Sequence, residues 1–425
     1  MKVLVVGNGG REHALSWKLL QSEKVTKVFC IPGNGGTATM PKCQNLAMSV
    51  DDFDGIARFA LVQGVAFVVV GPELPLALGI TDALQAQDIA VFGPTQAGAQ
   101  IESSKAWAKA LMQEAGIPTA QSATFDRTQV EDAKAYVKAV GAPVVVKADG
   151  LAAGKGVTVA RTLEEALSAI DGIARGQFGD AGNTLVVEEF LSGQEVSVLA
   201  LTDGETIVPL LPAQDHKPIG EGDTGPNTGG MGVYAPTPVL SPEQVKQVQR
   251  EILEPTIAAL RQRGIDYCGV LYAGLMVTPE GEVKVLEFNC RFGDPETQAV
   301  LPLLETPLYE LMLACVEKRL GQLPAIEWKK GAAVCVVMAS GGYPGSYEKG
   351  KLVEGILEAE ETGALVFHAG TQLKQQQLVT SGGRVLGVTA VGEDFEDAIA
   401  KSYAAVEKIE FENCYYRRDI GYRIR

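Results

Sequence analysis

The chain has 425 residues, 46% of them hydrophobic and 21% charged, a balance that is typical of a globular protein and excludes a disordered one. Its 37 basic residues stand against 52 acidic ones, and the net charge of −15 disfavours nucleic acid and anionic membranes as partners. Since no apolar stretch approaches the roughly 18 residues of a membrane helix, and the N-terminus lacks a signal-peptide core, we expect a cytoplasmic protein.

The first hundred residues alternate short β-branched runs with helical patterns. Buried strands are predicted at residues 3–6, 28–31 and 65–70, with amphipathic helices after the first and third of them. Strand and helix alternation at this spacing predicts a doubly wound parallel sheet, so residues 1–102 should form an α/β domain.

From residue 103 the pattern becomes mixed. A helix is predicted over residues 105–115, and strands over residues 144–148, 184–190 and 283–289. Residues 215–238 are rich in glycine, proline, asparagine and threonine and predict a long functional loop. After residue 328, strand patterns and an amphipathic helix predict a small α+β domain. We therefore expect domains at 1–102, 103–328 and 329–425, with a subdomain at about 122–192.

The seven cysteines are scattered and form no CxxC pair. Neither a zinc ribbon nor a disulfide framework is supported, and we expect buried free thiols.

Two glycine loops follow the first two predicted strands, GNGGREH at residues 7–13 and PGNGGT at residues 32–37. A helix N-terminus with nearby glycines favours an anion. A dinucleotide fingerprint would need a third glycine where Glu12 stands. The loops therefore favour a sugar phosphate over NAD, the alternative being simple tight turns.

A third glycine loop, ADGLAAGKGV at residues 148–157, follows the strand that carries Lys147. Its N–H groups are suited to wrapping phosphates, although the Walker pattern is absent. A buried ammonium needs an anionic partner, and for Lys147 this is either a phosphate or a nearby carboxylate.

Acidic residues interrupt the strand VVEEF. Alternation places Glu188 and Glu189 on opposite faces, and Glu195 follows in the next loop. These residues fit either an adenine hinge with a ribose-binding carboxylate, or ordinary solvated acidic positions.

The strand VLEFN runs directly into CRFGDPE. Glu287, Asn289 and Arg291 share one face by the period of two. A carboxylate and an amide oxygen suit Mg²⁺ that also binds nucleotide phosphates, and Arg291 offers a fork for a carboxylate or a phosphoryl group. In the loop at residues 215–238, His216 is either a catalytic base or a hydrogen-bonding neighbour.

Taken in order, these segments resemble the glycinamide ribonucleotide synthetase family of the ATP-grasp superfamily. The resemblance covers essentially the whole chain. It rests on GNGGREHAL, PGNGGT and GPELPL, then on SSKAWAK, VVVKADGLAAGKGV, VVEEFLSGQEVS, QDHKPIGEGDTGPNTGGMG and LEFNCRFGDPETQ, and finally on GGYPGSYEKG, FHAGT, TSGGRVLGVTA and RRDIGYR.

The resemblance implies a central ATP-grasp fold and a ligase of purine biosynthesis. It would join glycine to 5-phosphoribosylamine through a glycyl phosphate, forming ADP and phosphate. Mg²⁺ or Mn²⁺ would be the cofactor, the partners would be small molecules only, and the chain would be a monomer.

The resemblance also implies site residues. For ATP these are Lys105, Lys147, Ala152, Gly154, Lys155, Gly156, Glu188, Glu189, Phe190, Leu191 and Glu195, and for the metal Glu287 and Asn289. The glycine and catalytic candidates are Arg291, Asp215 and Lys217, and those for the sugar phosphate are Asn8, Gly9, Gly10, Gly33, Glu73 and Asp294.

Two alternatives remain, another ATP-grasp carboxylate–amine ligase and a non-catalytic nucleotide sensor. Another ATP-grasp ligase would not share the segments AQDHK and GPNTGGMG. A nucleotide sensor would have no need of Glu287, Asn289 and Arg291 together. The preceding strand, LYAGLM, carries no carboxylate, which argues against a second metal held wholly by protein.

Overall fold

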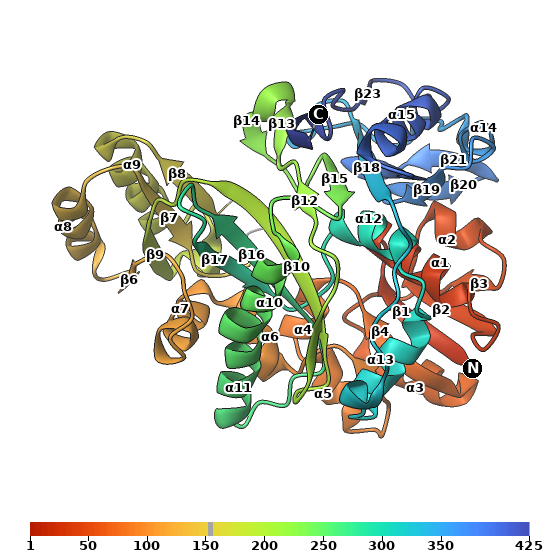
Figure 1. Ribbon diagram of the computed structural model, residues 1–425, viewed down its shortest axis with the longest axis horizontal. Coiled ribbons are helices and arrows are strands. Elements are labelled where there is room, and N and C mark those ends of the chain that lie inside the picture. The colour runs from red at the N-terminus through yellow and green to blue at the C-terminus, as the bar shows by residue number, and fades with distance from the viewer. Residues whose placement is uncertain (152–155, 425) are drawn as a thin grey trace.

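The computed structural model describes residues 1–151 and 156–424 (Figure 1). Its N-terminal part is a five-stranded parallel sheet in the order β3-β2-β1-β4-β5, which confirms the predicted doubly wound arrangement. The strands are β1 (Lys2–Gly7), β2 (Lys27–Pro32), β3 (Cys43–Asn45), β4 (Val65–Val70) and β5 (Val91–Phe92).

The two glycine loops lie at the carboxyl ends of β1 and β2. The first leads into α1 (Gly10–Leu20) and the second into α2 (Gly35–Thr39). The strand order reverses between β1 and β4, and open parallel sheets bind ligands outside the carboxyl ends of strands at such a point.

The central part contains two four-stranded antiparallel sheets. One has the order β6-β9-β7-β8, with β6 (Ser122–Asp126), β7 (Val144–Ala148), β8 (Val157–Ala160) and β9 (Thr184–Glu189). The helices α8 (Val130–Val140) and α9 (Leu163–Ala174) pack on it around a core of their own, and together they form the lobe at the left of Figure 1.

The second central sheet has the order β11-β10-β16-β17. Its strands are β10 (Gln194–Thr202), β11 (Ile207–Pro209), β16 (Gly269–Val277) and β17 (Val283–Asn289). The helices α6 (Gln96–Ser103) and α7 (Lys105–Glu114) pack against β17, and α7 also contacts β9. The predicted strands at residues 144–148 and 283–289 are confirmed.

The C-terminal sheet has the order β12-β15-β18-β22-β19, with β23 (Cys414–Tyr415) paired to β18. Its longest strands are β18 (Ala332–Ser340) and β22 (Arg384–Gly392), beside β19 (Leu365–His368) and α15 (Phe395–Val406).

The prediction of one long loop at residues 215–238 is wrong in detail. The segment contains the end of β12 (Gln214–Asp215), the hairpin β13 (Pro218–Gly220) and β14 (Thr224–Asn227), and β15 (Gly232–Ala235). The strand β15 pairs with β18, which lies about a hundred residues later in the chain. The local sequence therefore has no periodicity that would predict β15. A sheet thus crosses the predicted boundary at residue 328, and the three domain ranges stay a prediction.

All seven cysteines are free, five of them buried, as expected. Within residues 1–151 and 156–424, no helix has the length and apolar character that crossing a membrane requires.

Candidate active site

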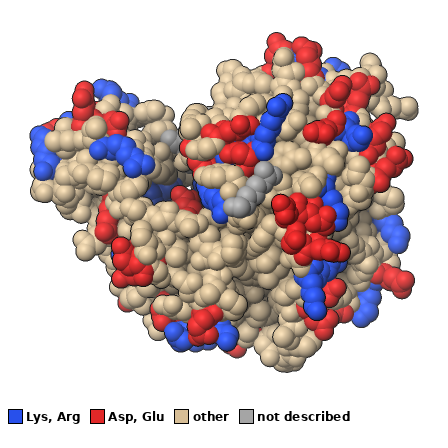
Figure 2. Space-filling model, turned by 45° about the horizontal axis from the view of Figure 1, so that its top comes forward, with Lys and Arg blue, Asp and Glu red and all other residues tan. Residues whose placement is uncertain are grey.

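A cavity of about 570 Å³ lies between the two central sheets. Its walls come from α7, β7, β9, β16 and β17, and from two short stretches at residues 215–217 and 227–229. Figure 2 shows the surface hollowed beside the lobe, with basic and acidic side chains inside the hollow.

Most of the predicted site residues line this first cavity. They are Glu73, Lys105, Lys147, Gly156, Glu188, Glu189, Phe190, Leu191, Glu195, Asp215, Lys217, Glu287, Asn289, Arg291 and Asp294. Ala152, Gly154 and Lys155 lie outside the described residues.

The surroundings of Lys147 fit both partners that the sequence left open, a nearby carboxylate and a phosphate. Its Nζ lies 3.0 Å from Glu188 Oε1, so a carboxylate does pair with it, yet it also lines the cavity. The other oxygen of Glu188 lies 3.2 Å from Lys109 Nζ. With two lysines around one buried carboxylate, this corner has excess positive charge and favours an anionic ligand.

The end of the cavity beyond Lys147 is apolar. Val145, Leu191, Met276 and Leu286 line it, together with Glu189 and Phe190. Alternation in β9 holds as predicted, because Glu188 is buried whereas Glu189 is exposed. An apolar slot edged by strand backbone suits a planar base.

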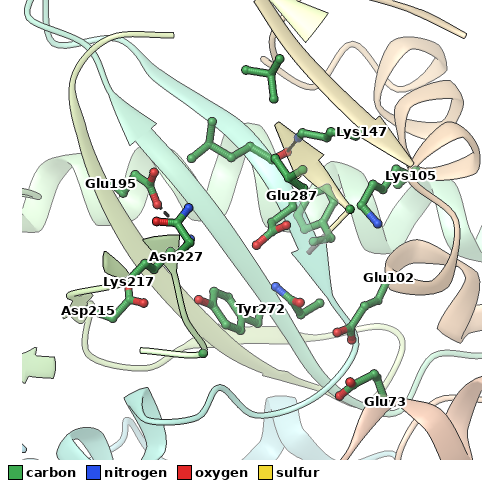
Figure 3. Close-up of a pocket in the computed structure, with 18 of the residues that line it drawn as sticks. Glu73, Glu102, Lys105, Lys147, Glu195, Asp215, Lys217, Asn227, Tyr272 and Glu287 are labelled. Atoms are coloured by element: carbon green, nitrogen blue, oxygen red, sulfur yellow. Dashed lines mark hydrogen bonds and ion pairs between the residues drawn. The ribbon is translucent and has the colours of Figure 1, made fainter. Parts of the chain in front are cut away.

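Glu287 stands between two groups of charged residues, as Figure 3 shows. Lys105 and Lys147 lie on one side and Lys217 on the other. Burial by itself raises the pKa of Glu287, but these lysines and Arg291 together lower it below its usual value. Glu287 is therefore ionised at neutral pH and available to a cation.

The side chain of Asn289 offers an oxygen beside Glu287 on the same strand. Among the described residues there is no cluster of three His, Cys, Asp or Glu suited to a metal. One carboxylate with one amide oxygen fits Mg²⁺, which keeps waters and takes other ligands from phosphates.

Arg291 is held by carboxylates on two helices. Its Nε lies 3.1 Å from Glu73 Oε2, on α4 (Glu73–Ala77), and its Nη2 lies 2.8 Å from Glu102 Oε1 on α6. Nη2 also donates to Asn289 Oδ1 at 3.3 Å. Burial lowers the pKa of Arg291, but Glu102 and Glu73 outweigh it and raise that pKa. These contacts fix the guanidinium next to Asn289, one of the two candidate metal ligands.

Asp215 faces the same cavity from the opposite wall. Burial raises the pKa of its carboxyl to about 7; the neighbouring Lys217 opposes this, and Glu296 and Glu195 add to it. Lys217 Nζ itself donates to Glu195 Oε2 at 2.9 Å. This wall therefore has more carboxylates than cations, the arrangement that attracts an ammonium group.

A second cavity, of about 870 Å³, lies over the glycine loops. Asn8, Gly9 and Gly33 line it from the N-terminal sheet, and Thr371 and Ser381 from the C-terminal part. Gly10 does not line either cavity, because it is buried against Gln298. Glu73 lines the first cavity and not the second.

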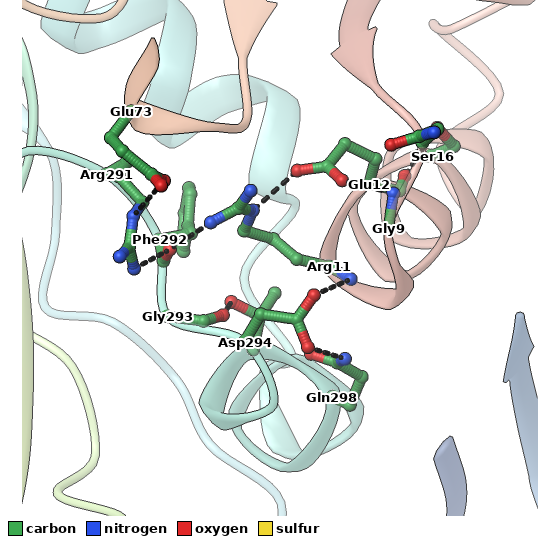
Figure 4. Close-up of polar contacts among 12 residues, drawn as sticks. Gly9, Arg11, Glu12, Ser16, Glu73, Arg291, Phe292, Gly293, Asp294 and Gln298 are labelled. Carbon is green, nitrogen blue, oxygen red and sulfur yellow. Dashed lines mark hydrogen bonds and ion pairs between the residues drawn. The ribbon is translucent and has the colours of Figure 1, made fainter. Parts of the chain in front are cut away.

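The two cavities adjoin each other. Asp294 and Arg384 line both, and Arg384 Nη2 lies 3.4 Å from Asp294 Oδ1. Arg11 and Arg291, which both line the first cavity, donate to the carbonyl oxygen of Phe292 at 3.0 and 3.2 Å (Figure 4).

Glu12 explains why the first glycine loop is not a dinucleotide fingerprint. Its carboxylate accepts the Gly9 N–H at 2.6 Å, and its side chain packs against Gly7 and Gly71. The place of the third fingerprint glycine is thus filled by a negative charge.

Several residues that line the first cavity were not predicted from the sequence. Glu102 and Tyr272 look like an ordinary helix carboxylate and strand tyrosine, and no local pattern distinguishes them. Asn227, Thr228 and Arg384 lie in the quoted segments TGPNTGGMG and TSGGRVLGVTA, whose glycines were the available signal. His216 does not line the first cavity; it is buried and accepts the Gly421 N–H at 3.3 Å.

Comparison with known proteins identifies the family. Three parts of the chain match the phosphoribosylglycinamide synthetase descriptions, the N domain over residues 1–102, the ATP-grasp (A) domain over 103–297 and the C domain over 333–423. The chain belongs to the phosphoribosylglycinamide synthetase family. It is 68% identical over 425 residues to the phosphoribosylamine–glycine ligase of a Nostoc strain, with full coverage of both chains. It is 49% identical to the Vibrio vulnificus enzyme of the same name, covering 98% of that protein.

Solved structures agree with this assignment. The crystal structure of phosphoribosylamine–glycine ligase from Thermotoga maritima is 33% identical, has a TM-score of 0.84 and covers 99% of this chain and all of that one. The biotin carboxylase domain of the Hydrogenobacter thermophilus 2-oxoglutarate carboxylase is 17% identical, with a TM-score of 0.73 over 98% of this chain and 91% of that one. At that identity the likeness concerns the fold alone.

Proposed function

We propose that the chain joins glycine to 5-phosphoribosylamine at the expense of ATP, forming glycinamide ribonucleotide in purine biosynthesis. Family membership supports this reaction. The observation that carries it is the pair of adjoining cavities that share Asp294 and Arg384. One is large enough for a nucleotide with a small amino acid, and the other lies over glycine loops suited to a sugar phosphate.

ATP occupies the first cavity in this proposal. Its base lies in the apolar slot beside Glu189–Leu191, its ribose near Glu195, and its phosphates near Lys105 and Lys147. Glu287 and Asn289 would hold a divalent ion, Mg²⁺ or Mn²⁺, whose chemistry is to neutralise charge on the phosphate oxygens.

Glycine lies between the opposite walls of that cavity. Arg291 offers its planar fork to the carboxylate, and Asp215 receives the ammonium group, with Lys217 beside it. The sugar phosphate binds in the second cavity at Asn8, Gly9 and Gly33, so its amine points toward the shared boundary at Asp294.

The chemistry requires an activated carboxylate. An amine cannot displace oxide, so a glycine oxygen first attacks the γ-phosphorus and ADP leaves. The phosphoribosylamine nitrogen then attacks the carbonyl carbon of glycyl phosphate, and phosphate departs with the glycine oxygen. Fixed cations around Lys147 stabilise charge on the transferring phosphoryl group without reorganising.

Oxygen transfer tests this route. Glycine labelled with ¹⁸O in its carboxylate should deliver one labelled oxygen to each phosphate released, and phosphate release should require both glycine and phosphoribosylamine. Mass spectrometry of the phosphate measures the label. Unlabelled phosphate at full amide formation would exclude the acyl phosphate, and phosphate release without glycine would point to a different reaction.

The pKa of Asp215 predicts a pH dependence. Because only the ionised carboxylate attracts the glycine ammonium, and burial raises this pKa to about 7, kcat/KM for glycine should rise with pH through about 7 and then level off. The profile is measured with ATP and phosphoribosylamine saturating. In Asp215→Asn the remaining activity should lose this rise, and a flat wild-type profile from about pH 6 to about pH 8 would contradict the role.

The monomeric state and the cytoplasmic location expected from the sequence remain predictions.

A further inference from the structure

The C-terminal end of the chain lies against the hairpin β13–β14. We call residues 415–424 the tail and residues 218–227 the hairpin. Figure 1 shows the C-terminus beside β13 and β14, although about two hundred residues separate them in the sequence. Tyr415 Oη donates to the carbonyl of Ile219 at 2.7 Å, and the Gly222 N–H donates to Asp419 at 2.8 Å.

Arg417 is the centre of this contact. Its side chain is 0% exposed, which is rare for arginine and requires full pairing. Nη1 reaches the hairpin twice, at the Pro218 carbonyl (3.1 Å) and at Asp223 Oδ1 (3.0 Å). Nε and Nη2 both bind Asp419 at 2.8 Å, so the guanidinium is fixed within the tail.

On the hairpin, the carboxylate of Asp223 accepts hydrogen bonds from several side chains of the tail. Besides Arg417, it accepts the Tyr422 hydroxyl at 2.6 Å and pairs with Arg423. Burial would raise the pKa of Asp223, but these hydrogen bonds lower it to about 2. The carboxylate is therefore ionised throughout the working range and binds these donors continuously.

Both ends of the hairpin are part of the first cavity's wall. Asp215 and Lys217 precede it, Asn227 is its last residue and Thr228 follows it, and all four line the cavity. The Thr228 N–H donates to the Lys217 carbonyl at 2.8 Å, which ties the two ends together. Arg423 also donates to the Asp215 carbonyl at 3.3 Å, so the tail contacts the wall itself.

We propose that Arg417 and Asp223 are positioning residues, through which the tail holds the hairpin so that Asp215 and Lys217 face glycine at the right distance. The proposal rests on the function proposed above. Neither residue lines the cavity, so neither contacts substrate. A reacting group displaced by about 1 Å can lose roughly a hundredfold in rate, and loops that carry such groups need rigid support.

The test compares Asp223→Asn and Arg417→Lys with the wild type. Asp223→Asn keeps the size of the side chain but removes its charge, and Arg417→Lys keeps the charge but removes the planar group that binds Asp223 and Asp419 together. We expect kcat/KM for glycine to fall roughly tenfold and KM for ATP to stay within about twofold, because none of the described residues that line the cavity belongs to the tail. The double variant should be no worse than the more impaired single one, since both remove the same contact.

Asp397→Asn is the matched control. Asp397 also pairs with a cation, Lys401 at 2.6 Å, in the C-terminal part, but it lines neither cavity. Asp397→Asn should leave both kcat/KM for glycine and KM for ATP unchanged. Thermal unfolding of each variant shows whether the fold is retained.

The outcomes separate the two proposals. Wild-type protein without glycine-dependent phosphate release would contradict the proposed function. An active wild type whose glycine constants are unchanged in Asp223→Asn and Arg417→Lys would contradict the positioning role. Equal losses for ATP and glycine that follow the lowered melting temperature would also overturn it, because they would indicate general destabilisation.

Discussion

Replacement of Glu287 by glutamine should lower kcat by roughly a hundredfold or more. The amide keeps the shape of the side chain but loses the charge that would hold the divalent ion at the phosphates. Metal stabilisation of a phosphoryl transition state is worth several kcal/mol, and about 1.36 kcal/mol corresponds to tenfold. Steady-state kinetics with increasing Mg²⁺ or Mn²⁺ measure the loss, and high metal should restore part of it.

Glu282→Gln provides the control for that measurement. Glu282 immediately precedes β17, pairs with Lys284 at 3.3 Å and lies outside both cavities. It carries the same charge change within the same hairpin and should retain full turnover. Near-normal kcat of Glu287→Gln at low millimolar metal would refute the metal assignment.

Valine at Gly9 should raise KM for phosphoribosylamine tenfold or more, while nucleotide affinity stays the same. A Cβ at Gly9 would lie 2.8 Å from Glu12 Oε2 and 3.1 Å from Asp294 Oδ2, both closer than ordinary contact. Overpacking of this kind costs about 1–3 kcal/mol, or roughly 5- to 150-fold in affinity. Alanine at the same position should give a smaller increase.

Gly172→Val controls for the introduction of a β-branched residue. Gly172 lies on α9, far from the two glycine loops after β1 and β2, and an added Cβ there meets only the flexible end of Gln177 within 3.5 Å. In Gly172→Val, KM for phosphoribosylamine and KM for ATP should both be unchanged. If Gly9→Val instead weakened ATP binding alone, the first glycine loop would have been assigned to the wrong ligand.

The first cavity has two walls of opposite charge. Lys105, Lys147 and Lys109 lie at the end where we propose that the phosphates bind, and Asp215, Glu195 and Glu296 lie at the opposite wall. In the proposed function, glycine binds between Arg291 and Asp215 with each of its charged ends facing the opposite charge. Burial raises the pKa of Asp215 to about 7, and the nearby carboxylates of Glu296 and Glu195 add to this rise.

Much of the fold could be read from local patterns. Runs such as VLVV and VAFVVV predict β1 and β4 because buried parallel strands are continuously apolar, and their alternation with helices predicts the parallel sheet. The face shared by Glu287 and Asn289 follows from the two-residue period of a strand.

Contacts between distant segments could not be read in this way. Periodicity reports which face of an element is buried, and it carries no information about the partner. Lys109 and Glu102 are charged positions on helices, and only tertiary packing places them against Glu188 and Arg291. The segment at residues 215–238 looked like a loop because β15 pairs with the distant β18 and the hairpin rests on the tail.

The sequence by itself determined the secondary structure of most of the sheets, the family and the residues that we propose for the nucleotide site, since these depend on local spacing and on long motifs. Only the tertiary structure decided that the C-terminal part completes the second cavity, that Asp294 and Arg384 join the two cavities, and that Arg417 is wholly buried. The physical reason is that charge pairing and cavity walls arise where segments hundreds of residues apart exclude water together, and no local pattern encodes that meeting.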